Sequence, residues 1–600
     1  MDREKDNLPG VPMEETAQVE SEKISDLSVS GKADLPDEAL REFESNEIES
    51  MPNREAFQAS DEESLSLLEQ LRAEKDVDPK ALRERWEEEK KEAAAIAKRR
   101  KEEGQAEKEP AKAALKEANA KVREAKAALR RAKTEEEAEK AKAALEEAEA
   151  NWTKADSDMR AVRNKLQLSR IKFRQDLVDQ KVLLSLRHLR MYFKLGSFPD
   201  YIKLKAVHDV SFDVYEGETF GIVGESGCGK STTGRCILKL YDITSGSIYY
   251  KGYRISGGDR WNRKEIKYTR IRTREAIKKL KAEEAELLQG KSESEAAEIK
   301  AKYAEQIAYL KDKQNAIVTH QKEKIAGIRR DNRHPPMELL NEIQMIFQDP
   351  VDSLDPRMTV EDIIQEGLRI QGHRNKRENH QKTVEILKKV GLVPEHASRY
   401  PHEFSGGQRQ RIGIARALIM NPKMLVCDEP ISALDVSIRA QIINLLNELK
   451  EEMGLTMIFI AHDLSTVKYF CNRIAVMYYG NLVELASSDE LFKHPLHPYS
   501  KSLLSAIPQP NPLSEKRRVR ITYNPMLVHD YRTQKPTFRE ILPGHFVLCN
   551  DAEFEKYQQE IADLDSGKLV LKNGTEVVGD NIEPKDPPKA ESIPETKHEK

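Results

Sequence analysis

The chain has 600 residues, more than one domain usually holds, so two or more structural units are expected. Its formal net charge of -4 gives no global argument for binding nucleic acid, which a strongly basic domain would give. The N-terminus lacks a basic stretch followed by an apolar one, and no apolar run is long enough to span a bilayer. We therefore expect neither a secretory leader nor a membrane-spanning helix.

The first 60 residues are acidic and poor in large apolar side chains. Such a segment cannot bury enough surface to offset the entropy lost on ordering. We expect residues 1–60 to form a disordered acidic lead.

Residues 61–178 hold long stretches of Ala, Glu, Lys and Arg, typical of solvated helices. Helix is expected from near Ser64, and Pro110 suits the first position of a helix. An apolar seam follows at Leu115, Ala118, Val122, Ala125, Leu129 and Ala132. Thr134 with Glu137 forms a capping box that opens a second helix with a matching seam. These patterns favour an antiparallel, coiled-coil-like hairpin over the alternative, one long solvated helix.

From residue 181 to 513, short apolar runs alternate with helical patterns, which predicts an α/β domain. Within it a glycine-rich segment follows an apolar strand and precedes a helical pattern that begins at Thr232. The segment reads Gly224, Glu225, Ser226, Gly227, Cys228, Gly229, Lys230 and Ser231. This spacing and context define a P-loop, whose backbone N–H groups converge on phosphate oxygens at a helix N-terminus. We expect Lys230 to pair with the β- and γ-phosphates of a nucleotide and Ser231 to bind Mg²⁺.

Residues 258–336 interrupt the α/β texture with a mostly charged stretch that carries two apolar seams. Gly290 lies in the expected turn between them. The pattern predicts an inserted helical hairpin with arms of about 25 residues, roughly 40 Å long at about 1.5 Å per residue. Its first half is markedly basic and could meet anionic lipid headgroups, nucleic acid or an acidic partner. A solvated face is the favoured interpretation.

A buried-strand pattern ends in the adjacent carboxylates Asp428 and Glu429. At the carboxyl edge of a parallel sheet such a pair lies where these sheets bind ligands. We expect Asp428 to hold the metal through water and Glu429 to orient or deprotonate an attacking water.

Residues 514–579 are expected to form a small accessory unit. It would contain a basic strand-like segment at 517–523, a helix at 552–563 and a β-hairpin at 569–578 that turns at Asn573 and Gly574. The tail, residues 580–600, is rich in Pro, Glu and Lys and is predicted to be disordered.

The five cysteines are scattered without CxxC spacing, which argues against a metal site or a disulfide framework. They are Cys228, Cys236, Cys427, Cys471 and Cys549.

Further motifs resemble the ABC ATPase family. The segment 404–411 resembles the family's signature loop, with Phe404 where Leu is more usual. Its phosphate-facing residues would be Ser405, Gly406 and Gly407, and Gln408 is a further candidate for nucleotide binding. Gln348 matches the Q-loop, Asp435 the D-loop and His462 the switch histidine. The resemblance covers residues 182–513 apart from the insertion, and it implies a P-loop domain with a helical subdomain.

The resemblance also implies roles. His462 would contact the γ-phosphate, and Gln348 would sense metal and water and link them to helices that touch a membrane partner. An aromatic residue would stack on adenine, for which Tyr201 is the candidate, with Phe198 and Phe193 as alternatives and simple packing equally open. The signature loop would cap ATP held by a second domain, so the active ATPase needs a partner copy.

Longer segments, 224–235, 343–360 and 494–510, resemble the oligopeptide, dipeptide and nickel importer ATPases, the first two specifically their F-type subunit. The resemblance implies a D-type ATPase partner, two transmembrane permease subunits and an external peptide-binding protein. It places the chain on the cytoplasmic face of the membrane, with ATP and Mg²⁺ as ligands. Some members bind an iron–sulfur cluster through C-terminal cysteines, but only Cys549 matches here, so no cluster is expected.

The helical arms keep another class open: a non-transport ABC ATPase acting in DNA maintenance, repair or regulation. In chromosome-maintenance and recombination ATPases the family resemblance places the coiled coil after the Q-loop, whereas this insertion precedes Gln348. Repair ATPases with nearer insertions carry zinc-binding cysteines, and translation-factor relatives carry two nucleotide domains. Transport is therefore favoured, and no nucleic-acid partner is expected.

Overall fold

The structure is a computed structural model that describes residues 78–196, 202–373, 375–507, 520–529, 531, 534–566, 569–572 and 575–578. The acidic lead, the C-terminal tail, Ser64, Phe198 and Tyr201 lie outside the described residues.

An eight-stranded mixed sheet forms the centre of the described fold, in the order β11-β12-β10-β9-β3-β8-β7-β6. Its strands are β3 (Thr219–Val223), β6 (Ile343–Ile346), β7 (Met424–Asp428), β8 (Thr456–Ala461), β9 (Arg473–Tyr478), β10 (Asn481–Ser487), β11 (Thr537–Leu542) and β12 (His545–Cys549). Strands β6, β7, β8, β3 and β9 run parallel, while β10, β11 and β12 are added antiparallel. The parallel strands β3, β7 and β8 are buried at every residue, which explains their continuous apolar sequences.

A second, antiparallel sheet has the order β2-β1-β4-β5. It consists of β1 (Val182–Leu195), β2 (Ile202–Tyr215), β4 (Ser245–Tyr250) and β5 (Tyr253–Asp259). Leu184, Leu186 and Ile248 from this sheet pack in one apolar cluster with Phe220 and Ile222 of β3. The two sheets and α6 (Lys230–Ile237) therefore share a core.

A helical region follows β6. It contains α10 (Pro350–Ser353), α11 (Val360–Ile370), α12 (Lys376–Lys389), the 3-10 turns η2 (Pro394–Ser398) and η3 (Pro401–Glu403), and α13 (Gly406–Leu418). Helix α9 (Met337–Asn341) lies just before β6. Ile364, Leu387 and Ile414 of these helices lie in one cluster with Leu425 and Phe459 of the central sheet. The helices α14 (Val436–Met453), α15 (Leu464–Phe470), α16 (Ser488–Lys493) and α17 (Pro498–Ser505) complete this side of the fold.

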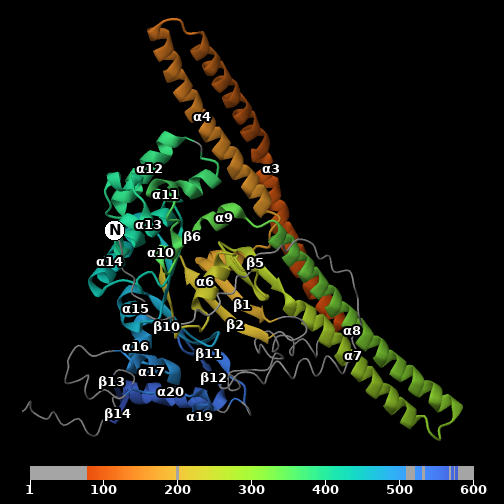
Figure 1. Cartoon of the computed structure of the whole chain (residues 1–600). Helices are drawn as coiled ribbons and strands as arrows, with labels where there is room; N and C mark the ends of the chain where they lie inside the picture. The colour runs from red at the N-terminus through yellow and green to blue at the C-terminus, as the bar shows by residue number, and fades with distance from the viewer. Residues whose placement is uncertain are drawn as a thin grey trace, which may run out of the picture. The chain divides into compact units, whose positions relative to one another are not determined.

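The N-terminal part of the described chain is a pair of long helices, α3 (Pro79–Arg131) and α4 (Glu135–Leu168), which run side by side (Figure 1). Lys126 of α3 pairs with Glu149 of α4 at 3.1 Å, and Trp152 donates to Asn119 at 3.0 Å. The predicted capping box of Thr134 is present at the start of α4.

Pro110 does not begin a helix, which corrects the sequence interpretation. It lies inside α3, which is continuous over 53 residues. Proline removes one helical hydrogen bond. Contacts with α4 on both sides of Pro110 hold α3 in place: Lys165 pairs with Glu107 at 2.6 Å, and Trp152 donates to Asn119 at 3.0 Å.

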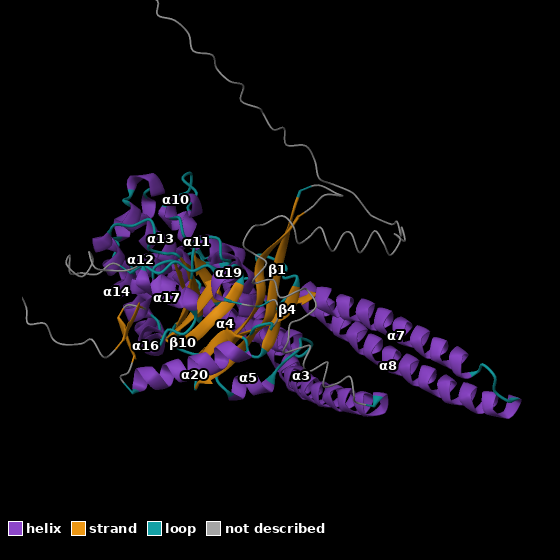
Figure 2. Ribbon diagram, turned by 90° about the horizontal axis from the view of Figure 1, so that it is seen from below, coloured by secondary structure: helices purple, strands orange, loops and turns teal. Residues whose placement is uncertain are grey.

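The insertion is a second pair of helices, α7 (Arg260–Leu287) and α8 (Glu293–Arg333), which run side by side away from the strands (Figure 2). Gly290 lies between them with a φ of +79°, a conformation that favours glycine. The arms are unequal, with 28 and 41 residues rather than about 25 each. The C-terminal end of the longer helix, α8, contacts β5. There Arg254 Nε donates to Asp331 Oδ2 at 2.9 Å in a buried pair.

The first turns of α3 pack against α8, so the two additions are in contact. Trp86 stacks on His320 with ring centroids 4.0 Å apart and an interplanar angle of 3°. Lys90 pairs with Glu323 at 2.9 Å, and Leu82 is fully buried. Burial lowers the pKa of His320 to about 3, so the stacked ring is neutral. The sequence patterns did not predict this contact.

The C-terminal residues join the central sheet. Strand β12 pairs with β10, and α20 (Asp551–Asp565) contributes Tyr557 and Ile561 to an apolar cluster with Val547. Strands β13 (Leu569–Lys572) and β14 (Thr575–Val578) pair antiparallel as predicted, while Asn573 and Gly574 lie outside the described residues. The strand expected at 517–523 is wrong for its described part, since residues 520–523 are irregular and lead to α19 (Pro525–Val528). Short helix α5 (Gln175–Asp179) precedes β1.

All five cysteines are buried and unpaired. Of the helices in the described part of the chain, none combines the length and the apolar character needed to cross a membrane.

Candidate nucleotide site

Four neighbouring parallel strands end at one edge of the central sheet, in the order β3, β8, β7 and β6. The P-loop follows β3, Glu429 follows β7, His462 follows β8, and Gln348 lies two residues beyond β6. The carboxyl ends of parallel strands meet at one edge, where such sheets bind ligands. Segments far apart in sequence are thereby brought to one site.

Backbone conformation in the P-loop requires glycine. Gly229 precedes α6 with a φ of +102°, and Gly224 has a φ of +151°. A Cβ atom on Gly229 would lie 2.2 Å from the carbonyl oxygen of Ala206, and one on Gly224 would lie 2.2 Å from that of Met477. The loop is thus packed against two other strands, and it opens directly into the N-terminus of α6, where backbone N–H groups and the helix dipole favour an anion.

Lys230 is buried, and its ammonium lies over the loop. Its Nζ donates to the carbonyl oxygens of Gly224 at 2.8 Å and Glu225 at 2.9 Å, and it lies 3.8 Å from Oε1 of Glu429. Phosphate-binding lysines act as such point charges.

Ser231 and Asp428 meet directly: the Ser231 hydroxyl donates to Oδ1 of Asp428 at 2.7 Å. Burial raises the pKa of Asp428, against the opposing effects of this hydrogen bond and of Arg235. Both are hard oxygen donors, which suit Mg²⁺; this ion needs only one or two protein oxygens beside phosphates and water. The residues present therefore fit Mg²⁺. Within the described residues, no three His, Cys, Asp or Glu side chains gather as a closed metal site.

Glu429 lies at the centre of the polar cluster. Its Oε2 accepts a hydrogen bond from Nε2 of Gln348 at 3.0 Å and lies 3.3 Å from Nδ1 of His462. Its backbone has a φ of +45°, a strained conformation for a residue with a side chain, and its N–H donates to the carbonyl of Ile460 at 3.0 Å. A cavity of about 20 Å³ beside Glu429 and His462 has room for about one water.

The signature-loop residues are not part of this cluster. Ser405 caps α13, accepting from the N–H of Gln408 at 3.4 Å, and Gln408 accepts in turn from the N–H of Ser405 at 3.1 Å. A Cβ on Gly407 would lie 2.7 Å from Cγ2 of Ile438, so the loop packs against the start of α14, which Asp435 precedes. No hydrogen bond or ion pair among the described residues joins Ser405 or Gln408 to the P-loop.

Among the adenine candidates, Phe193 is described. Its ring packs edge-on against Tyr241 with centroids 5.3 Å apart. That contact agrees with the packing alternative for Phe193.

Sequence reasoning missed Tyr499. Its hydroxyl accepts the backbone N–H of Glu225 at 3.0 Å, and its ring lies 4.4 Å from that of Tyr478 at the end of β9. Tyr499 thus supports the P-loop from α17, 274 residues away in sequence. The only signal was its place in the segment 494–510, to which no role was given.

Two family models match parts of this chain. The family described as "ABC transporter" matches residues 207–327 and 314–432, and the family described as "Oligopeptide/dipeptide transporter, C-terminal region" matches residues 483–536. The first match spans the P-loop, Gln348 and the acidic pair Asp428 and Glu429, so the class of protein is an ABC-type ATP-binding domain.

Three curated relatives match over nearly their whole length. The oligopeptide transport ATP-binding protein OppF of Bacillus subtilis is 46% identical over 62% of this chain and 98% of its own. OppF of Streptococcus mutans is 42% identical over 64% and 99%, and the dipeptide transport ATP-binding protein DppF of Lactococcus lactis is 41% identical over 64% and 99%. The chain therefore belongs to the ABC transporter family, among its ATP-binding proteins.

Solved structures are more distant. The cbiO1 subunit of Clostridium perfringens, described as part of an ABC transporter complex, is 21% identical, covers 52% of this chain and 92% of its own, and has a TM-score of 0.35. That score is too low to carry an argument.

Proposed function

We propose that this chain is the F-type ATPase subunit of an importer that takes up oligopeptides or dipeptides. The observation that carries the proposal is the contact of Glu429 with Gln348 and His462 beside Lys230. The names of the 41–46% identical relatives and the match at residues 483–536 support the substrate class.

In the proposed reaction, ATP lies with its phosphates against the P-loop N–H groups, from Gly224 to Thr232, and the ammonium of Lys230. Ser231, Asp428 and Gln348 would hold Mg²⁺, and the ion, when bound, would supply positive charge to the phosphate oxygens. Glu429 orients the attacking water and accepts its proton, while His462 contacts the γ-phosphate. The strained backbone of Glu429 fixes this carboxylate before ATP arrives, which avoids reorganisation during the reaction.

Ser405 caps α13 and Gly406, Gly407 and Gln408 begin it, and among the described residues none of them is hydrogen-bonded to this chain's own P-loop. We therefore propose that they cap ATP held by a second, D-type ATPase, with Asp435 at the contact between the two subunits. Tyr201 remains the proposed adenine-stacking residue. Two permease subunits would hold the pair at the cytoplasmic face of the membrane, and an external peptide-binding protein would deliver the substrate.

The proposed organisation keeps the units at 61–178, 181–513 with the insertion at 258–336, and 514–579. We also propose that each pair of long helices packs as an antiparallel coiled coil. No iron–sulfur cluster is proposed.

Affinity purification of the tagged chain from its own membranes tests the proposal. We expect a second ATPase and two integral membrane proteins to co-purify, and ATP hydrolysis by the complex to rise when a peptide-loaded binding protein is added. Recovery of DNA, or of ribosomes, without membrane subunits would contradict transport and favour the non-transport alternative.

A further inference from the structure

One edge of α3 carries a row of exposed basic residues in which no acidic residue occurs. Ten positions between 98 and 130, spaced by three or four residues, lie along this edge of the helix. Eight are basic, namely Lys98, Lys101, Lys108, Lys112, Lys116, Arg123, Lys126 and Arg130, and the other two are the amides Gln105 and Asn119. We call these eight basic residues the α3 row. At about 100° per residue they fall within an arc of about 80°, so they form one line about 48 Å long.

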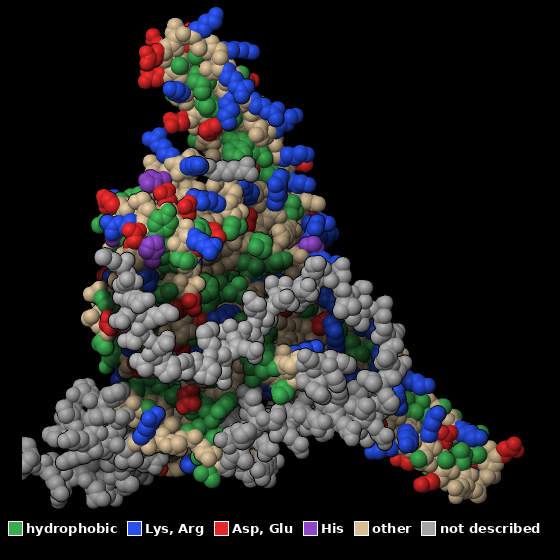
Figure 3. All heavy atoms as spheres, viewed as in Figure 1, with side chains coloured by type: hydrophobic (Ala, Val, Ile, Leu, Met, Phe, Trp, Pro, Cys, Tyr) green, Lys and Arg blue, Asp and Glu red, His purple; other side chains and the backbone are tan. Residues whose placement is uncertain are grey.

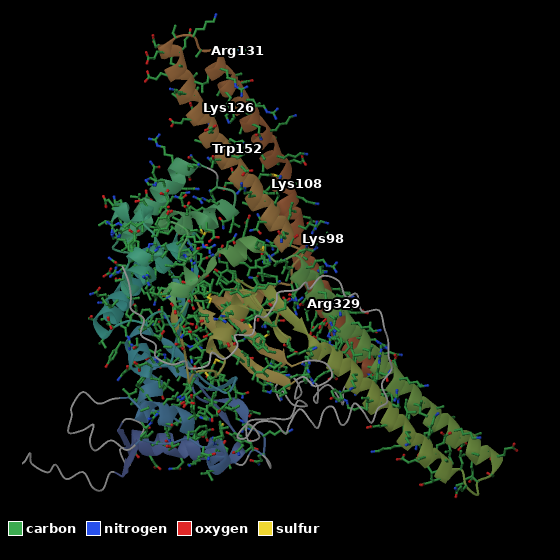
Figure 4. The ribbon with its side chains drawn as sticks, in the orientation of Figure 1. Lys98, Lys108, Lys126, Arg131, Trp152 and Arg329 are labelled. Atoms are coloured by element: carbon green, nitrogen blue, oxygen red, sulfur yellow. The ribbon has the colours of Figure 1, made fainter. Side chains whose placement is uncertain are left out.

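The figures show this arrangement. Lys and Arg side chains follow one edge of the arm in Figure 3, while acidic groups gather elsewhere on it. Figure 4 shows Lys98, Lys108 and Lys126 one after another along α3. No acidic residue interrupts the ten positions, although α3 has many acidic residues on its other faces.

The described chain neutralises little of the α3 row. Lys126 pairs with Glu149 at 3.1 Å, and Lys98 lies 3.9 Å from Glu102. For the other six, no ion pair with another described residue is found. The basic start of the inserted hairpin differs, because Arg263 pairs with Asp259 at 2.7 Å and Arg272 with Glu265 at 3.0 Å.

Such a row weakens the isolated helix. Like charges at i and i+4, as in Lys108, Lys112 and Lys116, repel one another. A partner of opposite charge that touches the whole row converts this repulsion into binding.

We propose that the α3 row binds the anionic lipid headgroups of a membrane surface. A straight line of charges meets a plane along its full length, whereas the phosphates of a nucleic-acid duplex follow a helical path and would meet only part of it. Clusters of four to eight Lys or Arg on a helix are typical of proteins held at anionic lipid by charge. The row has no large apolar side chain, so the helix lies on the headgroups without inserting. This inference rests on the proposed function, which already places the chain at a membrane.

Vesicle binding by the purified full chain tests the inference. The probes are vesicles of phosphatidylcholine alone and of phosphatidylcholine mixed with phosphatidylserine. We expect binding only to the mixed vesicles, with affinity falling as salt rises. Each basic residue near such a surface adds about fivefold to binding, so reversing four of them with K101E, K112E, K116E and R123E should weaken it at least about a hundredfold.

A matched control reverses the same residue types on α7, with R274E, K278E, K279E and K281E, all exposed in the structure. It changes the net charge equally and should bind like the unmodified chain. Equal loss in both variants would show that net charge alone drives binding and would overturn the inference.

Two other occupants are outcomes of the same experiment. Duplex nucleic acid is added as a competitor of the mixed vesicles. If it displaces the chain at a concentration below the lipid concentration that half-saturates vesicle binding, the row is a nucleic-acid surface and the inference is wrong. If the full chain does not bind vesicles but a variant without residues 2–77 does, the acidic N-terminal segment occupies the α3 row, and the inference is again wrong. Co-purification of K101E/K112E/K116E/R123E with permease subunits separates the two proposals: retained co-purification with lost vesicle binding leaves the importer proposal standing.

Discussion

At the scale of single residues, Glu429 combines three features. It has a positive φ, two polar neighbours from other strands, and a position 3.8 Å from a buried lysine. A surface carboxylate has no need for such support. The arrangement instead suits a base whose geometry must be set before the substrate binds.

Replacing Glu429 by Gln should lower ATP turnover of the assembled complex by at least about a hundredfold, because the amide cannot accept the proton of the attacking water. ATP affinity should stay near that of the unmodified chain, since the P-loop is unchanged. Steady-state hydrolysis and equilibrium binding of a fluorescent ATP analogue measure the two effects.

Lys230→Ala is the contrasting variant. It removes the ammonium that lies over Gly224 and Glu225, so nucleotide affinity itself should fall. Turnover that is normal in Glu429→Gln, or affinity that is unchanged in Lys230→Ala, would contradict the site.

At the scale of elements, the two ends of the inserted hairpin should contribute differently to stability. We call the end near Asp331, which contacts β5, the root, and residues 275–309 the tip. Asp331, at the end of α8, forms a buried pair with Arg254 of β5 and accepts the N–H of Lys172 at 3.3 Å. Removal of residues 258–333 would take away this carboxylate and the contacts of α8 with Trp86 and Lys90 of α3. A simple late addition would not be tied to the fold in this way.

Asp331→Ala should lower the free energy of unfolding by about 3–5 kcal/mol, because it leaves the Arg254 charge buried and unpaired. The double variant Arg254→Met with Asp331→Leu should recover most of that loss. Removing only the tip, residues 275–309, keeps the bond from Asn262 to Gln321 at 2.7 Å and should leave the melting temperature nearly unchanged. Thermal unfolding of all three checks the division. Failure of the tip deletion to fold would show that the whole hairpin is structural.

The junction of β10 and β12 should make stability depend on pH. His545 lies 2.8 Å from Glu484, which also accepts the backbone N–H groups of Leu496 and His497. Burial lowers the pKa of His545, but the hydrogen bond and charge of Glu484, with Glu490 nearby, outweigh it and raise the pKa above the ordinary value.

Because the folded state holds this proton more tightly, its stabilisation is complete below about pH 6.5 and is lost as pH rises through the folded pKa. His545→Gln should therefore lower stability by about 2 kcal/mol near pH 6 and by less near pH 9. Melting temperatures of both proteins at the two pH values measure this. A gap that widens with pH would refute the assignment.

At the scale of the whole molecule, one chain presents half of each of two nucleotide sites in the proposed dimer. Ser405 caps α13 at the exposed end of the helical region, where its hydroxyl and the helix N-terminus would face phosphates of the partner.

Ser405→Asp should fold normally, since Asp is as good an N-cap as Ser, but its negative charge should repel those phosphates. We expect this chain to keep its own ATP affinity while hydrolysis by the complex falls at least about tenfold. Ser405→Asn, a neutral cap of similar size, is the control and should lose less. Equal activity of the Asp variant and the unmodified complex would contradict the composite site.

Much of this protein could be read from local sequence, because the physical causes are local. The P-loop glycines are needed by their own backbone angles, the capping box of Thr134 closes within four residues, and the continuous apolar runs of β7 and β8 follow from burial on both faces. Carboxyl-edge residues such as Glu429 and His462 then become predictable as a cluster, since parallel strands end together.

Only the tertiary structure decided the contacts between distant segments, because the local sequence of one segment does not predict which other segment it touches. Tyr499 on the P-loop, Trp86 on His320, and β12 joining the central sheet beside β10 each depend on chain paths over long sequence separations. At Pro110 tertiary packing overrides a local preference. Proline favours the start of a helix, but Pro110 lies inside α3, which packs along its length. An amphipathic seam predicts that one face of a helix is buried. Which segment buries that face depends on the fold as a whole.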